Sequence, residues 1–246
     1  MVRDRTLGAI LVDVLCHVLL LLIGLACLVP LLHIVAVSFS NNAAAVGRKV
    51  TFWPVGFNLR NYLYVVAWPQ FRTSFMISVM RVLGGTFLDL LVTVLTAYAL
   101  ATKEAFPGKQ AFKWILIFSM LFSGGLIPWY LALRSLGLIN TLWGLIVPQA
   151  MSPFDIIIAL NFFRQLPAEM AEAGEIDGAS HWDILFRIFL PLSLPMLATI
   201  TLMNAVWHWN AWFDGLIVMT DQAKQPLQTY LQTTLMGQIM ALQFGI

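Results

Sequence analysis

The stretch EAGEIDGASHWDILFRIFLP, residues 172–191, contains the densest acidic segment of the chain. Three carboxylates, Glu172, Glu175 and Asp177, fall within six residues, and Gly174 and Gly178 punctuate them. The sequence on either side is almost free of charge. This segment therefore joins two apolar parts of the chain, and its structure is the first question that the sequence raises.

Composition indicates a membrane protein. Of the 246 residues, 60% are hydrophobic and 11% are charged. Ordinary soluble domains are roughly 25% charged, so a water-soluble fold of this size would lack the polar surface that it needs. The formal net charge of +2 and the lack of a lysine- or arginine-rich run argue against a nucleic-acid partner. We therefore expect an integral membrane protein in contact with lipid.

Five apolar runs are long enough to cross the hydrocarbon core, which takes about 20 residues of helix. They are continuously apolar rather than alternating, which predicts an all-α polytopic membrane helical bundle and not a β-barrel. Within the third run, Gly124 and Gly125 allow either close helix packing or a bend, and we expect packing. The predicted spans are 14–38, 73–100, 113–133, 141–163 and 191–219.

Neither a disulfide nor a metal site is expected. Cys16 and Cys27 lie eleven residues apart in one apolar run, which separates them by about 16 Å along a helix. That distance is too long for a disulfide. The four histidines are scattered along the chain without the spacing of a metal site.

The acidic segment carries the signals of two short helices joined by a turn. Pro167 suits a first helical turn, and Gly178 suits the left-handed residue that closes a helix. Ser180, followed three residues later by Asp183, predicts a reciprocal cap on the second helix. Pro191 then begins the next span. Such a segment is either an ordinary solvated surface or a surface that fits a groove on another protein.

The same residues resemble the "EAA loop" in permease subunits of bacterial ATP-binding-cassette importers. That pattern is E-A-A-x-x-x-G, followed after nine residues by I-x-L-P, and Gly174 departs from it mildly by replacing the second alanine. The stretches FSGGLIPWYLALRSLGLINTLWGLIVP (122–148), NFFRQLP (161–167) and VWHWNAWFD (206–214) are similar to carbohydrate-uptake permeases, the alginate and aldouronate systems included. The matching loop positions are Glu172, Ala173, Asp177, Gly178, Ala179, Ile188, Leu190, Pro191 and Pro195.

The resemblance implies a type I importer permease fold and a transport subunit that is not an enzyme. It also implies a second homologous permease, two ATPase subunits and an extracytoplasmic sugar-binding protein as partners. The implied substrate is an oligosaccharide, with uronate-containing ones such as alginate included. ATP and magnesium would belong to the partner ATPases, because this chain has no G-x-x-x-x-G-K-[ST] phosphate loop. The residues expected to couple to the ATPase are Glu172, Ala173, Gly174, Asp177, Gly178 and Ala179.

The resemblance further implies a topology. Residues 1–50 would hold the N-terminal span and the start of a periplasmic loop, and residues 51–246 the permease core, with the coupling loop at 164–190 in the cytoplasm. Flanking charges alone are nearly balanced under the positive-inside rule, so the loop places the N-terminus in the cytoplasm of a bacterial inner membrane. Arg3 and Arg5 would then precede an uncleaved span rather than a signal peptide. The family has six spans, so we expect the sixth to be missing from this sequence.

Two charged residues lie inside the second predicted span. Arg81 and Asp89 would each cost roughly 2.5–3.5 kcal/mol facing lipid at mid-membrane. They are eight residues apart, about 12 Å along a helix, which is too far for direct pairing. Either they line the translocation path, or Arg81 snorkels to the interface and Asp89 hydrogen-bonds a Thr or Ser on another helix.

The stretch VWHWNAWFD offers aromatic rings and amides of the kind that bind sugars. Its tryptophans are either sugar contacts or an interfacial belt. The favoured substrate contacts are Asn204, His208 and Asn210. The alternative function is a secondary sugar transporter driven by an ion gradient, which would use acidic groups at mid-membrane. Asp89 alone supports that alternative, and it leaves the acidic loop unexplained.

Overall fold

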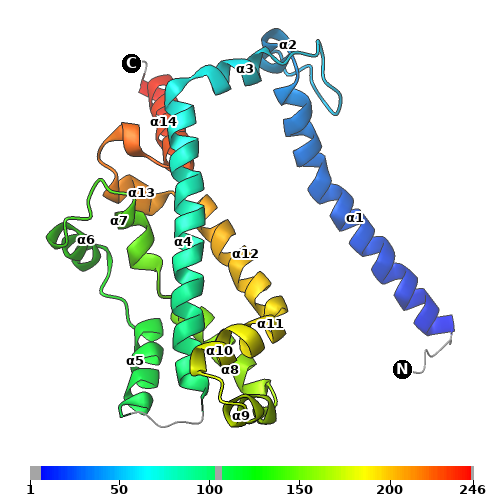
Figure 1. The fold of residues 1–246 in the computed structure, drawn as a ribbon. Coiled ribbons are helices and arrows are strands. Elements are labelled where there is room, and N and C mark those ends of the chain that lie inside the picture. The colour runs from blue at the N-terminus through cyan, green and yellow to red at the C-terminus, as the bar shows by residue number, and fades with distance from the viewer. Residues whose placement is uncertain (1–6, 103–106, 245–246) are drawn as a thin grey trace. The chain divides into compact units, whose positions relative to one another are not determined.

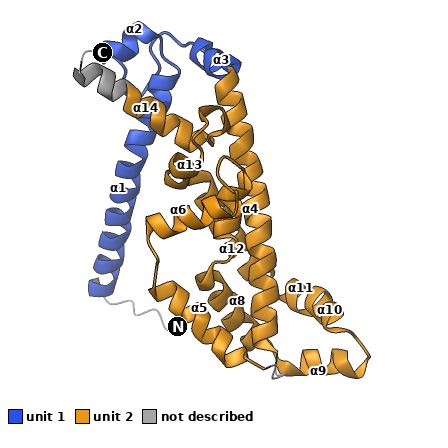
Figure 2. Cartoon of the chain, turned by 90° about the vertical axis from the view of Figure 1, so that its left-hand side faces the viewer, with its two compact units in different colours: residues 1–68 blue, residues 69–246 orange. Residues whose placement is uncertain are grey.

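A computed structural model describes residues 7–102 and 107–244, so Arg3 and Arg5 lie outside the described residues. The described residues form helices and no strand, which confirms the all-α prediction. Two compact units divide the chain at Trp68 (Figures 1 and 2). The sequence prediction instead placed a boundary at residue 50.

Unit 1 extends past residue 50 to Trp68, because the loop after the first helix packs against the end of the same helix. The Asn58 amide donates to the Phe39 carbonyl at 2.8 Å. Ala36, Ala44 and Val50 form a small buried cluster. The helices of this unit are α1 (Leu7–Ser38), α2 (Asn42–Val46) and α3 (Arg60–Ala67).

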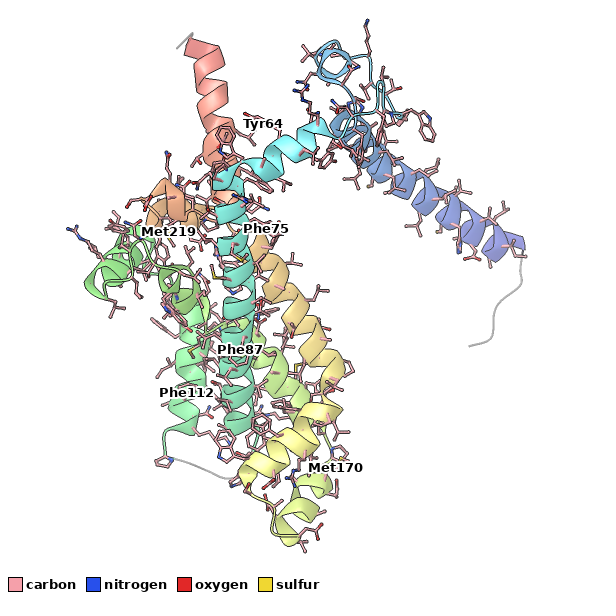
Figure 3. All side chains as sticks on the ribbon, turned by 45° about the horizontal axis from the view of Figure 1, so that its top comes forward. Tyr64, Phe75, Phe87, Phe112, Met170 and Met219 are labelled. Atoms are coloured by element: carbon pink, nitrogen blue, oxygen red, sulfur yellow. The ribbon has the colours of Figure 1, made fainter. Side chains whose placement is uncertain are left out.

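Unit 2 is organised around the long helix α4, which packs against α12 and α8 (Figure 1). Its main core includes Ala97, Ile156, Ile184 and Ile200, all at most 1% exposed. The outward faces of α4 carry large apolar side chains such as Phe87 (Figure 3), as expected for a helix in lipid. The elements are α4 (Pro69–Ala101), α5 (Lys109–Leu121), α6 (Leu126–Ser135), α7 (Trp143–Ile146), η1 (Val147–Gln149), α8 (Pro153–Gln165), α9 (Ala168–Ile176), α10 (His181–Ile184), η2 (Leu185–Phe189), α11 (Leu190–Leu192), α12 (Leu194–Asn210), α13 (Phe213–Val218), η3 (Gln222–Lys224) and α14 (Leu227–Phe244).

Two of the described helices are long and apolar enough to cross a membrane by themselves, Gly8–Ser38 and Pro69–Ala101. Three further helix pairs qualify only when each bent pair is taken as one span, which gives up to five spans. Five is the number that the sequence predicted, but three of the five are interrupted. The helix α14 (Leu227–Phe244) does not meet the same test and lies beyond the last span that the sequence predicted.

The third span breaks at the paired glycines, with 120° between α5 and α6. Gly125 has φ +82° and ψ −179°, a conformation open essentially to glycine alone. A Cβ built on Gly125 would meet nothing within 4 Å. The glycine pair therefore serves a bend, and the expectation of close helix packing there is wrong.

The fifth span differs from the predicted 191–219 at both ends. An 81° bend separates α11 from α12, at Ser193. Pro191 and Pro195 flank this bend, and each lacks the N–H that would continue the helical hydrogen bonds. A π-helical turn, η2, precedes it. At the far end α12 stops at Asn210, and α13 begins only at Phe213.

Gly85 on α4 lies directly against His208 of α12. A Cβ at this position would overlap three atoms of the buried His208 ring. We predict that Gly85→Ala lowers the free energy of unfolding by about 1–3 kcal/mol, because the ring has no room to retreat. The measurement is chemical denaturation in mild detergent. Gly24→Ala on α1, where nothing lies within 4 Å, is the matched control and should be neutral or stabilising. Equal effects of the two changes would contradict the close packing.

Candidate functional site

The acidic loop folds as the sequence predicts, as a helix, a glycine turn and a second helix. The Gly178 amide donates to the Glu175 carbonyl at 3.0 Å, and the Ala179 amide donates to the Gly174 carbonyl at 2.9 Å. Together with φ +79° at Gly178, these two bonds form a Schellman motif at the end of α9. The loop is thus a defined structure rather than a slack connection.

The second helix of the loop has the predicted reciprocal cap. The Ser180 hydroxyl accepts from the Asp183 amide at 3.2 Å, and the Asp183 carboxylate accepts from the Ser180 amide at 3.3 Å. The Ser180 hydroxyl donates to the Asp183 carboxylate at 2.6 Å, and this bond, the bond from the Ser180 amide and the nearby Arg187 hold the pKa of Asp183 below its ordinary value. The cap therefore remains formed at neutral pH.

The six residues predicted to couple to an ATPase lie in the C-terminal half of α9 and in the turn after it, and most of them are exposed. Glu172, Ala173, Asp177 and Gly178 are exposed, and Ile176 is 86% exposed. The partly buried Gly174 lies against the second helix, since a Cβ there would come within 3.3 Å of the Ile184 and Ile188 side chains. The glycine that departs from the family pattern thus allows α9 to approach that helix closely.

Arg81 is fully buried and ion-paired, which excludes snorkelling in this structure. Its guanidinium binds the Asp214 carboxylate through both terminal nitrogens, one of them at 3.2 Å. It also lies over the Trp207 ring, with its carbon 5.7 Å from the ring centroid. The partner is 133 residues away in the sequence, in the first turn of α13.

The break between α12 and α13 is held by side chains on both sides. Arg81 donates to the Ala211 carbonyl at 3.1 Å, and the Thr229 hydroxyl donates to the Trp212 carbonyl at 2.9 Å. Backbone carbonyls freed by a broken helix inside a membrane need such partners. This break is therefore a built feature of the fold.

Asp89 and His208 form a second buried pair between α4 and α12. The Asp89 carboxylate lies 3.0 Å from His208 Nε2, and the residues are 3% and 1% exposed. The predicted Thr or Ser partner of Asp89 is therefore replaced by a histidine. Among the described residues, no three His, Cys, Asp or Glu side chains come together to hold a metal ion.

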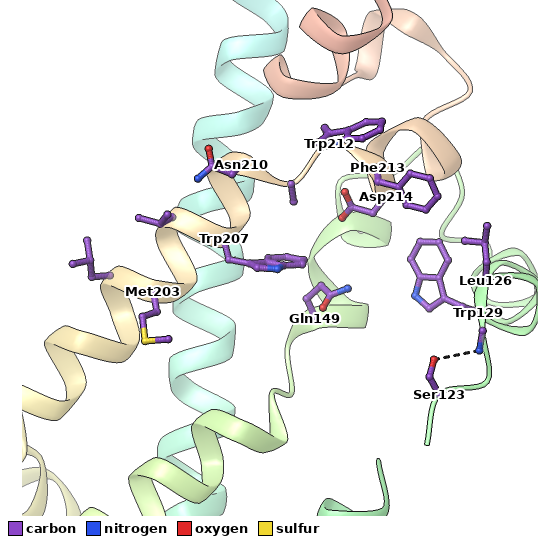
Figure 4. A pocket seen from close by; sticks show the side chains of 14 residues that line it. Ser123, Leu126, Trp129, Gln149, Met203, Trp207, Asn210, Trp212, Phe213 and Asp214 are labelled. Atoms are coloured by element: carbon purple, nitrogen blue, oxygen red, sulfur yellow. Dashed lines mark hydrogen bonds between the residues drawn. The ribbon is translucent and has the colours of Figure 1, made fainter. Parts of the chain in front are cut away.

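A large pocket of about 1080 Å³ lies between α6 and the C-terminal half of α12. Trp207 and Trp129 point into it from opposite sides (Figure 4). Of the predicted substrate residues, Asn210 lines the pocket, whereas Arg81, Asp89, Asn204 and His208 do not. Its aromatic and polar lining residues are Trp129, Trp207, Trp212, Phe213, Ser123, Gln149, Asn210 and Asp214.

Sequence reasoning missed the pocket residues Trp129, Gln149 and Asp214 as site candidates. Asp214 belongs to the quoted stretch VWHWNAWFD, so an ionisable residue within a predicted span was a usable signal. Trp129 and Gln149 come from other helices, and nothing local in the sequence marks them.

Comparison with protein-family models identifies the family of this chain. Residues 100–246 match the family model described as "Binding-protein-dependent transport system inner membrane component". The chain belongs to this permease family. The permease chain is 42% identical to Protein LplC of Bacillus subtilis (strain 168) over 220 residues, which cover 89% of this chain and 74% of LplC.

Other relatives carry more specific names. The permease chain is 37% identical over 222 residues to the polygalacturonan/rhamnogalacturonan transport system permease protein YtcP of Bacillus subtilis (strain 168), covering 90% of this chain and 77% of YtcP. It also matches a chain in the crystal structure of a bacterial ABC transporter involved in the import of the acidic polysaccharide alginate. There the TM-score is 0.88 and the identity 33%, over 94% of this chain and 82% of that one. These relatives confirm an importer permease fold and a transport subunit rather than an enzyme.

The buried pair of Asp89 and His208 gives a stability prediction. His208→Leu should lower the free energy of unfolding by about 3–5 kcal/mol, because it leaves a buried carboxylate without its partner. Asp89→Leu should cost less, about 1–3 kcal/mol, because the remaining imidazole can stay neutral.

Denaturation of each single variant and of the double variant in mild detergent measures both effects. The double variant should lose less than the sum of the two single losses. The control is His33→Leu on α1, an exposed position that loses only a hydrogen bond to the Thr51 carbonyl and should cost at most about 1 kcal/mol. Additive losses would show that the two side chains do not interact.

Proposed function

We propose that this chain is one of two permease subunits of an ATP-driven importer of oligosaccharides. The observation that carries the proposal is the exposed, doubly capped α9–α10 loop, whose carboxylates and Ile176 present a surface suited to a partner. Membership of a binding-protein-dependent transport family supports import with a sugar-binding protein. It also favours this function over an ion-driven secondary transporter.

The proposed assembly contains a second homologous permease, two ATPase subunits and an extracytoplasmic binding protein. The ATPases would hold ATP and magnesium, and α9 would sit in a groove of one ATPase with Glu172, Ala173, Gly174, Asp177, Gly178 and Ala179 at the contact. The coupling loop would then face the cytoplasm, together with the N-terminus.

The pocket at the break of α12 is the proposed part of the sugar path. Its indoles offer flat apolar faces for the C–H faces of sugar rings, and Gln149, Asn210 and Asp214 offer hydrogen-bond partners for hydroxyls. Asn204 and the buried groups Arg81, Asp89 and His208 would support this wall from behind. The names of the relatives favour oligosaccharides that include uronates, since YtcP is named for polygalacturonan and the solved transporter for alginate.

The turn at Gly178 gives a direct test of coupling. A Cβ at Gly178 would meet nothing within 4 Å, so a substitution acts through backbone strain at φ +79° or on the partner, not through a clash inside this chain. We predict that Gly178→Val, which strains this conformation by about 1–2 kcal/mol, loses the ATPase from the complex and lowers uptake at least about tenfold.

Gly178→Asn is the matched control, because asparagine tolerates positive φ far better than valine. Mild-detergent pull-down of each variant from its native membranes, with mass spectrometry of the captured subunits, measures the coupling. Both variants should accumulate in the membrane. Normal ATPase capture and uptake by the valine variant would rule out the coupling loop.

The energy source gives a second test. We predict that oligosaccharide uptake continues at a similar rate when an uncoupler collapses the proton gradient while ATP is maintained. Uptake by intact cells, with cellular ATP measured in parallel, provides the reading. Uptake that stops while ATP stays constant would identify an ion-driven transporter instead.

A further inference from the structure

The pocket wall contains one acidic side chain, Asp214, and the buried Arg81 neutralises its charge. Asp214 is the one ionisable residue among the described residues that line the pocket. Its side chain is only 14% exposed, and the Arg81 guanidinium beneath it is fully buried. The wall thus presents a carboxylate edge to the pocket without a net charge.

The geometry holds that carboxylate in one place. Arg81 binds both of its oxygens, and the Gly215 amide donates to Asp214 Oδ1 at 2.8 Å. A two-pronged arginine–carboxylate pair fixes orientation as well as charge. Arg81 also reaches the Ala211 carbonyl and lies against Trp207, so it contacts three wall residues at once.

We propose that Arg81 determines the charge selectivity of this pocket: by neutralising and orienting Asp214, it lets acidic saccharides pass a wall that would otherwise repel them. No cation of the described part of the chain lines the pocket, so nothing else there would offset a bare Asp214. Arg81 is therefore a positioning residue that acts through Asp214. This inference rests on the proposed function, because it takes the pocket as part of the sugar path.

Two opposite charge changes separate this role from a purely structural one. Arg81→Gln leaves Asp214 bare and makes the wall anionic, whereas Asp214→Asn leaves Arg81 uncompensated and makes it cationic. The probes are trigalacturonate and its trimethyl ester, which are the same sugar with and without negative charge. A unit charge about 7 Å away in water-like surroundings changes local affinity ~2- to 3-fold.

In uptake by the complete importer, Arg81→Gln should lower the ratio of acid to ester uptake by ~2- to 3-fold or more, and Asp214→Asn should raise it by a similar factor. The double variant should return the ratio to the parent value. Arg134→Gln on α6 removes an equal charge from an exposed site that does not line the pocket, and should leave the ratio unchanged. Single variants that move the ratio in the same direction, or not at all, would overturn the proposal, as would an equal effect of Arg134→Gln.

A second measurement does not depend on the substrate. Tryptophan fluorescence of the purified complex is quenched by anionic iodide and by neutral acrylamide. The differences between variants report the charge near Trp207, Trp129 and Trp212, because the other tryptophans are the same in every variant. Iodide quenching relative to acrylamide should fall in Arg81→Gln and rise in Asp214→Asn, and equal quenching would reject the charge role. If the parent importer takes up neither sugar form, uronate import fails, while the quenching still decides the role of Arg81. Asp214→Asn leaves the buried Arg81 charge unpaired but keeps one acceptor oxygen for its guanidinium, so it provides the decision where Arg81→Gln fails to accumulate.

Discussion

A guanidinium buried within a membrane helix needs a partner, and the Arg81–Asp214 pair shows how this chain provides one. A buried charge without its partner costs several kcal/mol, so this pair fixes α13 against α4. The same guanidinium donates a hydrogen bond to the Ala211 carbonyl, which the break after α12 leaves without a helical partner. One side chain thus answers two demands of the bilayer, for paired charges and for satisfied backbone. The pocket wall therefore lies where the ion pair meets the break after α12.

The pair belongs to a polar stripe along α4. Ser74, Ser78, Arg81, Gly85 and Asp89 recur at helical spacing, and all five are buried. The Ser78 hydroxyl accepts from the Leu227 amide at the start of α14, and Asp89 meets His208 on α12. In water such a stripe would face solvent, whereas in a bilayer it faces the other helices. The helix α4 is therefore central because its polar face must be covered by the rest of the unit.

The sequence predicted those features that depend on neighbouring residues. The turn at Gly178 and the cap at Ser180 and Asp183 are local, and the structure has both. The partner of Arg81 was not predictable in this way, because Asp214 is 133 residues away. Spacing along the helix could only show that Arg81 does not pair with Asp89. At Gly125 a bend was one of two sequence-based alternatives, but close packing was preferred. The break at Ala211 was missed because hydropathy runs through it without a change. A glycine conformation permits the first break, and a side chain from a distant helix supports the second. The polar stripe on α4 was visible in the sequence and would have indicated a buried face.

The fifth span connects the acidic loop to the pocket wall through two interruptions of different character. Between them α12 has 17 residues, about 26 Å of helix. At the Ala211 end, Arg81 and Thr229 bind successive carbonyls, and Gly85 lets His208 lie close against α4. At the other end the bend follows from Pro191 and Pro195, and the buried Ser193 hydroxyl has no hydrogen-bond partner among the described residues. Interfaces held by several specific bonds move as units, whereas bends at helix ends absorb changes in backbone angles. Under the proposed function, the bend at Ser193 would be the joint beside the proposed ATPase contact, and the bonded break at Ala211 would hold the proposed sugar-facing wall in place.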